Sequence, residues 1–543
     1  MSVPTQSRAI NPWVVTCSVM LATFMEILDT TVVNSSIPHI AGNLSATVDE
    51  GTWAVTSYLV ANAIILPMTG WLANFIGRKR LLLTATVGFT VTSVLCGMAT
   101  NLEALIFFRV LQGLSGGCMQ PLAQAILLET FPQKKHGQAM AAFAFGILLA
   151  PIVGPALGGW ITDHYSWRWI FYLNVPVGVL AVVLVSRFVF DPEYLARRAR
   201  RVDGWGIGFL ALWIGALQIV LDTGQKHDWF ESNYIRACAG LCVFGLVAFL
   251  VREFTTDDPV VDLHVFRDKT FAAGTFLITI IGFILYASLV LLPIYLQTLM
   301  GYPAYDAGLA ISPRGLGALI MMPVTGYLVG RVPSRLLIAI GLVLGAVTMT
   351  RFGGLNLQAG YWDIFWPQVF QGCGMAFLFV PITAMSVAHI TKVKMGNATS
   401  IFNLVRNIGG SFGIAIMTTF LARRSQYHLN RLGENVSIYD PQTQQMLAAT
   451  RAWFQSRGDD AYTATRRAYG AIYGMAQQQA AMRSFVESFW VLAVLFAGVL
   501  PLVFLMTEVH KRAPAPPAES VPPQRVDLAP APEHEEERAP VHA

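Results

Sequence analysis

Two acidic residues stand in the first long apolar stretch of the chain, where charge is costly. Glu26 and Asp29 lie three residues apart in "ATFMEILDTTVVNSSIP", so they share one face of a helix. A carboxylate at the centre of a bilayer costs roughly 2.5–3.5 kcal/mol on insertion scales. In a low-dielectric medium, beside a second acid, such a group favours its protonated form. The pair could therefore exchange a proton between the two sides of a membrane. The alternatives are cation binding or contact with a wet cavity mouth.

Basic residues also occur inside apolar segments. Arg109 lies in the apolar segment 103–128, Arg314 in 307–329 and Arg406 in 397–421. An arginine that approaches a carboxylate favours release of its proton. We interpret Arg109 as a coupling residue, the alternative being a side chain that extends to the membrane surface. Arg314 and Arg406 either bind anionic substrate groups or stabilise helix ends.

The composition indicates a membrane around these charges. The chain has 543 residues, of which 54% are hydrophobic and 13% charged, whereas a soluble domain carries about 25% charged residues. Its apolar blocks approach the roughly 20 residues that a membrane helix needs. We therefore predict an all-α polytopic membrane protein with about fourteen transmembrane helices, near residues 13–37, 52–73, 81–100, 103–128, 138–161, 169–190, 205–222, 235–252, 271–296, 307–329, 335–353, 363–387, 397–421 and 486–507.

The loops predict the orientation, because basic residues accumulate in cytoplasmic loops. Lys and Arg cluster in alternate loops, as at Arg78–Arg80 and Lys134–Lys135, whereas the loops 38–51 and 297–306 contain neither. With an even number of spans, both termini lie in the cytoplasm. We expect a multi-pass protein of the inner (plasma) membrane, in contact with the lipid bilayer.

Internal similarity divides the spans into two homologous halves. "PMTGWL" at 67–72 recurs as "PVTGYL" at 323–328, and "RVLQG" at 109–113 recurs as "QVFQG" at 368–372. Gln368 is therefore the counterpart of Arg109, and the offset leaves room for two inserted spans. Parallel halves are typical of alternating-access transporters. The predicted parts are a cytoplasmic N-terminus (1–12), a six-helix bundle (13–190), a cytoplasmic linker with two inserted helices (191–270), a second six-helix bundle (271–510) and a disordered cytoplasmic tail (511–543).

Several stretches resemble motifs of the major facilitator superfamily. They are "GWLANFIGRKRLLL" (70–83), "FFRVLQGLSGG" (107–117) and "GILLAPIVGPALGGWITD" (146–163). "LDTTVVNSSIP" is similar to the first-span motif of the fourteen-span drug:proton antiporter branch (EmrB/QacA type), and the resemblance is closest to EmrB-like multidrug efflux permeases. The resemblance implies the major facilitator fold and a proton-coupled antiporter that exports amphipathic toxic compounds, giving drug resistance. A proton-coupled uptake symporter, or an exporter of one specific metabolite, is the alternative on this fold.

The resemblance assigns roles to the charged residues and to the fifth span. Asp29 matches the family's first-span aspartate and takes the proton-coupling role with Arg109. Glu26 either shares that role or attracts a cationic substrate. A conformational seam between the halves is expected at the small residues of the fifth span, the alternative being ordinary helix packing. These residues are Gly154, Pro155, Gly158 and Gly159.

A cytoplasmic gating loop is expected from the first of the three motifs. Asn74 stands where the family usually has an acidic residue, so it offers only neutral hydrogen bonds. The basic residues of this loop either take part in gating or only mark the topology. The residues of the predicted loop are Gly70, Asn74, Gly77, Arg78 and Lys79.

Bulky amphipathic compounds, which are small lipophilic substrates, need a cavity with aromatic, soft and polar side chains. Packing in the core or against lipid is the alternative for each aromatic residue. The predicted cavity residues are Phe24, Met25, Tyr58, Gln112, Phe143, Arg314 and Arg406.

A polar segment, 422–485, is predicted as a long periplasmic loop that contains amphipathic helix. Exporters of the resembled type work with a periplasmic membrane-fusion adaptor and an outer-membrane channel, and this loop is a candidate docking surface. The alternative is a lid over the cavity mouth.

Other function classes lack their motifs in this sequence. Neither D-x-D, H-x-x-x-x-D nor H-E-x-x-H of membrane-embedded enzymes occurs, and no Walker A loop for ATP is present. A receptor that uses an inactive transporter fold remains a rival interpretation, which the intramembrane charges disfavour. The six cysteines fall within apolar blocks and form no C-x-x-C pair. We therefore expect no enzymatic activity, metal, cofactor or nucleic-acid partner, and a proton gradient as the source of energy.

Overall fold

The computed structural model describes residues 11–191, 203–256, 258–434, 436, 437 and 439–505. Its contacts divide the chain into the units Met1–Glu508 and Val509–Ala543. The second unit lies outside the described residues, as do the predicted tail 511–543, most of the predicted N-terminus 1–12 and the first part of the linker. Everything below concerns the first unit.

Fourteen helical segments within the described residues are long and apolar enough to cross a membrane. This confirms the predicted number of spans and the all-α fold class. Two spans of the first half consist of two consecutive helices, α5–α6 and α8–α9. The helices of this half are α1 (Pro12–Asn43), α2 (Val48–Gly51), α3 (Trp53–Ile76), α4 (Arg78–Gly97), α5 (Leu102–Gly116), α6 (Met119–Thr130), α7 (His136–His164), α8 (Trp169–Tyr172) and α9 (Asn174–Phe188).

The inserted helices and the helices of the second half come next along the chain. The inserted pair is α10 (Gly204–Thr223) and α11 (Asn233–Thr255). The second half contains α12 (Lys269–Thr298), α13 (Ala304–Ile311), α14 (Pro313–Leu328), α15 (Ser334–Phe352), α16 (Tyr361–Ser386), α17 (Met395–Glu434), α18 (Pro441–Ser456) and α19 (Ala461–Val499). Short 3₁₀ turns lie at Gln133–Lys135, Gly224–His227, Trp229–Glu231, Leu263–Arg267, Lys392–Lys394 and Leu500–Leu505.

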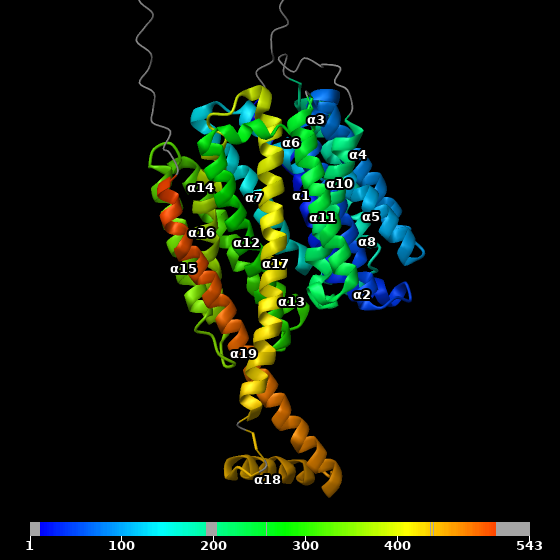
Figure 1. Cartoon of the computed structure of the whole chain (residues 1–543), viewed down its shortest axis with the longest axis vertical. Coiled ribbons are helices and arrows are strands. Elements are labelled where there is room, and N and C mark those ends of the chain that lie inside the picture. The colour runs from blue at the N-terminus through cyan, green and yellow to red at the C-terminus, as the bar shows by residue number, and fades with distance from the viewer. Residues whose placement is uncertain (1–10, 192–202, 257, 435, 438, 506–543) are drawn as a thin grey trace, which may run out of the picture. The chain divides into compact units, whose positions relative to one another are not determined.

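The segment 422–485, predicted as a long loop that contains amphipathic helix, is helical over most of its length. The span that was expected to end at 421 continues in α17 to Glu434, and α19 runs without a break from Ala461 into the last span. A helix satisfies its own backbone hydrogen bonds on both sides of a membrane boundary, so nothing forces it to end there. The side chain of Asp460 caps α19 by accepting from the backbone N–H groups of Tyr462 and Thr463. Figure 1 shows α17 and α19 extending past their neighbours, with α18 across their ends.

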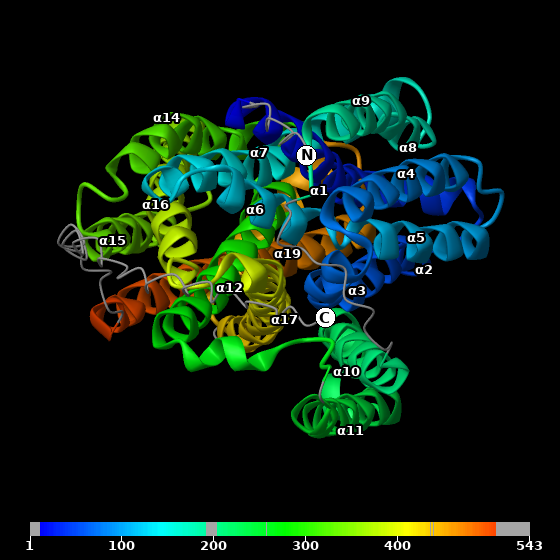
Figure 2. The ribbon, with the colours of Figure 1, turned by 90° about the horizontal axis from the view of Figure 1, so that it is seen from above.

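The two halves meet on two sides: α7 packs on α13, α14 and α16, and α17 packs on α3 and α6. The inserted α10 packs on α3 and α17, and α11 packs on α10. Figure 2 shows this inserted pair outside the helices of both halves, beside α3 and α17. Residues at these helix contacts, including those between α6 and α17, can therefore connect events in one half to the other.

Candidate functional site

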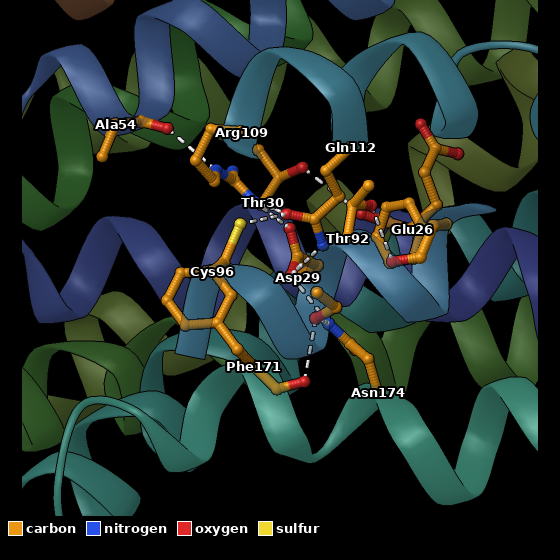
Figure 3. A network of polar contacts seen from close by, with 12 residues as sticks. Glu26, Asp29, Thr30, Ala54, Thr92, Cys96, Arg109, Gln112, Phe171 and Asn174 are labelled. Carbon is orange, nitrogen blue, oxygen red and sulfur yellow. Dashed lines mark hydrogen bonds and ion pairs between the residues drawn. The ribbon is translucent and has the colours of Figure 1, made fainter. Parts of the chain in front are cut away.

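Asp29 on α1 is buried at the centre of a polar cluster in the first half (Figure 3). One oxygen, Oδ2, accepts from Arg109 Nη1 at 2.5 Å. The other, Oδ1, accepts from Asn174 Nδ2 at 2.7 Å and from Gln112 Nε2 at 3.2 Å. Three donors, one of them a cation, surround this carboxylate. The bond from Arg109 is charge-assisted, the strongest kind of hydrogen bond that a carboxylate accepts.

Arg109 on α5 is held from several sides. Its side chain is fully buried. Its Nε donates to the carbonyl of Ala54 at 2.9 Å, and Nη1 donates to Gln112 Oε1 at 2.8 Å. The guanidinium also lies over the rings of Tyr58, at 4.1 Å, and Phe171, at 5.8 Å, where cation–π attraction adds to the ion pair. Arg109 points inward to Asp29 and does not extend to the membrane surface.

Glu26 occupies a different environment one turn earlier on α1. Its Oε1 accepts from Asn62 Nδ2 at 2.9 Å and from Gln120 Nε2 at 3.2 Å, whereas its Oε2 is buried without a hydrogen-bond partner among the described residues. Both donors are neutral amides. Glu26 and Asp29 are thus close in sequence but differ in the charge of their partners, which separates their chemistry.

Gln120 on α6 connects Glu26 to the second half. Its side-chain oxygen accepts from Arg406 Nη2 on α17 at 2.8 Å, while its nitrogen donates to Glu26. Two further bonds join α6 to α17: Asn403 Nδ2 donates to Gln124 Oε1 at 2.5 Å, and Thr399 Oγ1 donates to the Pro121 carbonyl at 3.1 Å. One amide therefore lies between an acid of the first half and a cation of the second.

The second half contains a related cluster without an acid. Arg314 on α14 donates from Nε to Gln368 Oε1 at 2.8 Å and from Nη2 to Gln371 Oε1 at 2.7 Å. Gln371 Nε2 in turn donates to Ser288 Oγ on α12 at 3.2 Å. Within the part of the chain that the structure describes, the hydrogen bonds of the Arg314 side chain go to these two amides and to no helix-end carbonyl.

The predicted cavity residues are not gathered around one described pocket. Met25, Tyr58 and Phe143 are packed in the hydrophobic core, and Phe24 is half-buried. Gln112 contacts Asp29 and Arg109 instead, while Arg314 and Arg406 belong to separate clusters. Two surface pockets lie elsewhere, one between α17 and α19 near Trp490 and one between α18 and α19 near Trp453.

The small residues of α7 face two different neighbours. A Cβ on Gly154 would collide with Thr31, and one on Gly158 would lie within 3 Å of the Val32 carbonyl, so both glycines pack on α1 of the same half. Pro155 faces Gly308 of the second half, and a Cβ on Gly159 would meet nothing within 4 Å. Of these four residues, Pro155 is the one placed against the second half.

The predicted gating loop is mostly helical: Gly70 and Asn74 belong to α3, Arg78 and Lys79 belong to α4, and Gly77 alone lies between the two helices. This segment contacts both halves. A Cβ on Gly70 would lie 2.6 Å from the Cα of Asn397, because α3 and α17 touch backbone to backbone there. Arg78 forms an ion pair with Glu129 and donates from Nη2 to the Lys392 carbonyl at 3.4 Å.

The rest of this loop is held by an acid that follows α9. Gly77 has φ +97°, a conformation that favours glycine, and two residues later the Lys79 N–H donates to Asp191 Oδ1 at 2.8 Å. No hydrogen bond of the Asn74 side chain is found in the described part of the chain. The acidic partners of the basic loop are therefore Glu129 and Asp191.

Sequence reasoning missed the amides and acids that complete these clusters. An Asn or Gln within an apolar span is costly unless it is hydrogen-bonded, so its presence alone was a usable signal. The missed residues are Asn62, Gln120, Gln124, Glu129, Asn174, Asp191, Gln371 and Asn403.

Comparisons with known proteins agree with this architecture. The sequence profile of the Major Facilitator Superfamily matches residues 19–414. The chain is 39% identical over 495 residues to the multidrug export protein EmrB of Haemophilus influenzae, covering 90% of this chain and 94% of that protein. It is 35% identical over 507 residues to the fatty acid resistance protein FarB of Neisseria gonorrhoeae, covering 93% and 98%. The proton:xylose symporter XylE has a similar fold, with a TM-score of 0.58 at 14% identity, covering 92% and 96%.

Proposed function

Because this chain belongs to the Major Facilitator Superfamily, we propose that it is a proton-coupled multidrug exporter of the inner membrane that works by alternating access. The names of its relatives, multidrug export protein and fatty acid resistance protein, support small amphipathic compounds as its substrates. The proposal places both termini in the cytoplasm and assigns the chain no enzymatic reaction.

The observation that supports proton coupling is the buried pair Asp29–Arg109 beside Glu26. In the proposed mechanism Asp29 stays ionised while Arg109 contacts it, and Glu26 carries a proton on Oε2. When the halves separate, water reaches the cluster. Protonation of Asp29 then releases Arg109, whose charge favours loss of the proton from Glu26. One charge that crosses 100 mV supplies about 2.3 kcal/mol.

The change of conformation would involve the contacts between the halves. Gln120–Arg406 links the acid cluster to α17, and Gly70–Asn397 and Arg78–Lys392 close the end that carries the basic loop. We assign that end to the cytoplasm. The helical projection of α17, α18 and α19 would then lie in the periplasm, as a docking surface for a membrane-fusion adaptor and an outer-membrane channel.

Proton release from inverted membrane vesicles tests this function. Vesicles with an acidic interior receive ethidium, a lipophilic cation, while the external and internal pH are followed. Wild type should release protons when ethidium is added, and Asp29→Asn should not. Glu103→Gln changes an exposed acid at the start of α5 and should behave as wild type. Ethidium that accumulates without any proton release, or no ethidium transport at all, would refute proton-coupled export.

A further inference from the structure

The clusters around Arg109 and Arg314 are related by the internal repeat. An offset of 259 residues relates Asp29 to Ser288, Arg109 to Gln368 and Gln112 to Gln371. Gln112 Nε2 donates to Asp29 at 3.2 Å, and Gln371 Nε2 donates to Ser288 at the same distance. The two halves therefore build the same amide contact between equivalent helices.

The charges of the two clusters differ. Arg314 stands 256 residues after Tyr58, so α14 corresponds to α3. The arginine of the first-half cluster is therefore on α5, whereas that of the second-half cluster is on the counterpart of α3. The acid has been replaced by a hydroxyl at Ser288. In the first half the charges of Asp29 and Arg109 cancel, whereas the second-half cluster contains a guanidinium and three neutral side chains.

The positive charge of Arg314 is not offset by a nearby acid or aromatic ring among the residues that the structure describes, unlike the charges of the other two intramembrane arginines. Arg109 pairs with Asp29, and Arg406 reaches Glu26 through Gln120 and lies over the Phe379 ring at 5.6 Å. Among the described residues neither an acid nor an aromatic ring contacts the guanidinium of Arg314 in this way. Arginine keeps its charge in proteins, so an anion is the species that completes such a site.

Two donors of this cluster have no partner. Arg314 Nη1 and Gln368 Nε2 are both buried without a hydrogen-bond acceptor among the described residues. Arg314 is 3% exposed, and Gln368 and Gln371 are fully buried. Close contact between α14 and α16 fixes the cluster, because a Cβ on Gly372 would collide with the Arg314 carbonyl. The donors are therefore held in place rather than disordered at a surface.

We propose that Arg314 and Gln368 form an anion-binding site, which accepts the carboxylate of an amphipathic acid or a free halide when the two halves separate during alternating access. Arg314 supplies the charge and Nη1, and Gln368 supplies Nε2. The site deepens the proposed export function, on which it rests, by adding anionic amphiphiles to the substrates. It is distinct from the Asp29 cluster, which carries an acid.

Binding to the purified full-length chain tests the site without transport. Decanoate is titrated calorimetrically in gluconate buffer, with decanol as the uncharged ligand of equal chain length. Arg314→Gln removes the cation, and Gln368→Glu supplies an internal counter-ion while it keeps the side-chain length. Both variants should weaken decanoate binding at least tenfold and leave decanol unchanged. Arg351→Gln, at an exposed arginine of α15, should bind as wild type.

A second experiment, in which chloride is added, distinguishes a halide from a carboxylate as the anion that binds. If chloride occupies the site, it raises the unfolding temperature of wild type and competes with decanoate, and Gln368→Glu loses both effects. If only the carboxylate binds, chloride has no effect. Equal responses of wild type and Gln368→Glu to both anions would overturn the inference. Ethidium export by wild type tests the proposed function separately, since binding is measured without it.

Discussion

Arg406 on α17 and Gln120 on α6 form a hydrogen bond of 2.8 Å that joins the two homologous halves beside Glu26. A protonation change at Glu26 alters what its oxygens can accept from the Gln120 amide. The amide cannot turn toward one neighbour without changing its contact with the other. The proton state of the first half is thereby connected to a helix of the second.

Replacing Gln120 should separate proton movement from transport. Gln120→Leu removes a donor from Glu26 and an acceptor from Arg406, and each unpaired buried group costs about 1–3 kcal/mol. We expect fewer protons released per ethidium exported in proteoliposomes. Gln124→Leu is the matched control, because it removes the acceptor of Asn403 without touching Glu26. Equal losses in both variants would mean that Gln120 only holds the halves together.

The two acids of α1 should differ in their effect on stability. Asp29→Asn leaves Arg109 without a counter-ion, and removing one partner of a buried pair costs about 3–5 kcal/mol. Glu26→Gln keeps an oxygen that can accept from Asn62 and Gln120, so its cost should be about 1 kcal/mol or less. Thermal unfolding of the purified variants measures both. The predicted difference between the two acids is wrong if Glu26→Gln lowers the unfolding temperature as much as Asp29→Asn does.

The number of spans was predictable because hydrophobic length is a property of each segment alone. The ends of the spans were less predictable. The apolar composition stops near residue 421 and begins again near 486, whereas α17 continues past the first limit and α19 begins before the second. Helix formation follows backbone hydrogen bonding and continues through polar sequence, so composition does not fix where a helix ends.

The charged members of the candidate site were predictable from the sequence, whereas Gln112 was predicted only as a cavity residue. Glu26, Asp29 and Arg109 were conspicuous because charge is rare in a span. The amide partners that were not predicted, Asn62, Gln120 and Asn174, come from α3, α6 and α9, and the sequence does not say which faces of these helices meet. The repeat identified Gln368 as the counterpart of Arg109, but the shift of the cation to Arg314 depends on how α14 and α16 pack.

The crossing of α3 and α17 should depend on the absence of a side chain at Gly70. Its Cβ position lies 2.6 Å from the Cα of Asn397, so Gly70→Val must push the two helices apart. Close packing through small residues is what stabilises helix contacts in lipid, and we expect ethidium export to fall at least about tenfold. Gly240→Val on α11 is the control, because a Cβ there meets nothing within 4 Å. Normal export by Gly70→Val would show that this contact is dispensable.

The segment between α11 and α12 is attached to α17 by Asp262. Its Oδ2 accepts from Lys394 Nζ at 2.9 Å, and its backbone carbonyl accepts from Asn397 Nδ2 at 2.8 Å. Burial disfavours the charged carboxylate, but the bonds from Lys394 and from the His264 N–H outweigh it and lower the pKa of Asp262 below its ordinary value. This lowering makes its contribution to stability pH-dependent.

A carboxyl with a lowered folded pKa stabilises above its unfolded pKa of about 3.9 and loses that contribution as the pH falls through the folded value. Asp262→Asn should therefore lower the unfolding temperature at pH 7, by the equivalent of about 1 kcal/mol or less because the pair is partly exposed. The difference from wild type should shrink below about pH 4. Glu231→Gln, at an exposed acid without a described partner, should show no difference at either pH. A difference that stays constant from pH 7 down to pH 3 would assign the effect to the hydrogen bond between the Asn397 side chain and the Asp262 backbone. The charge of Asp262 would then not be its cause.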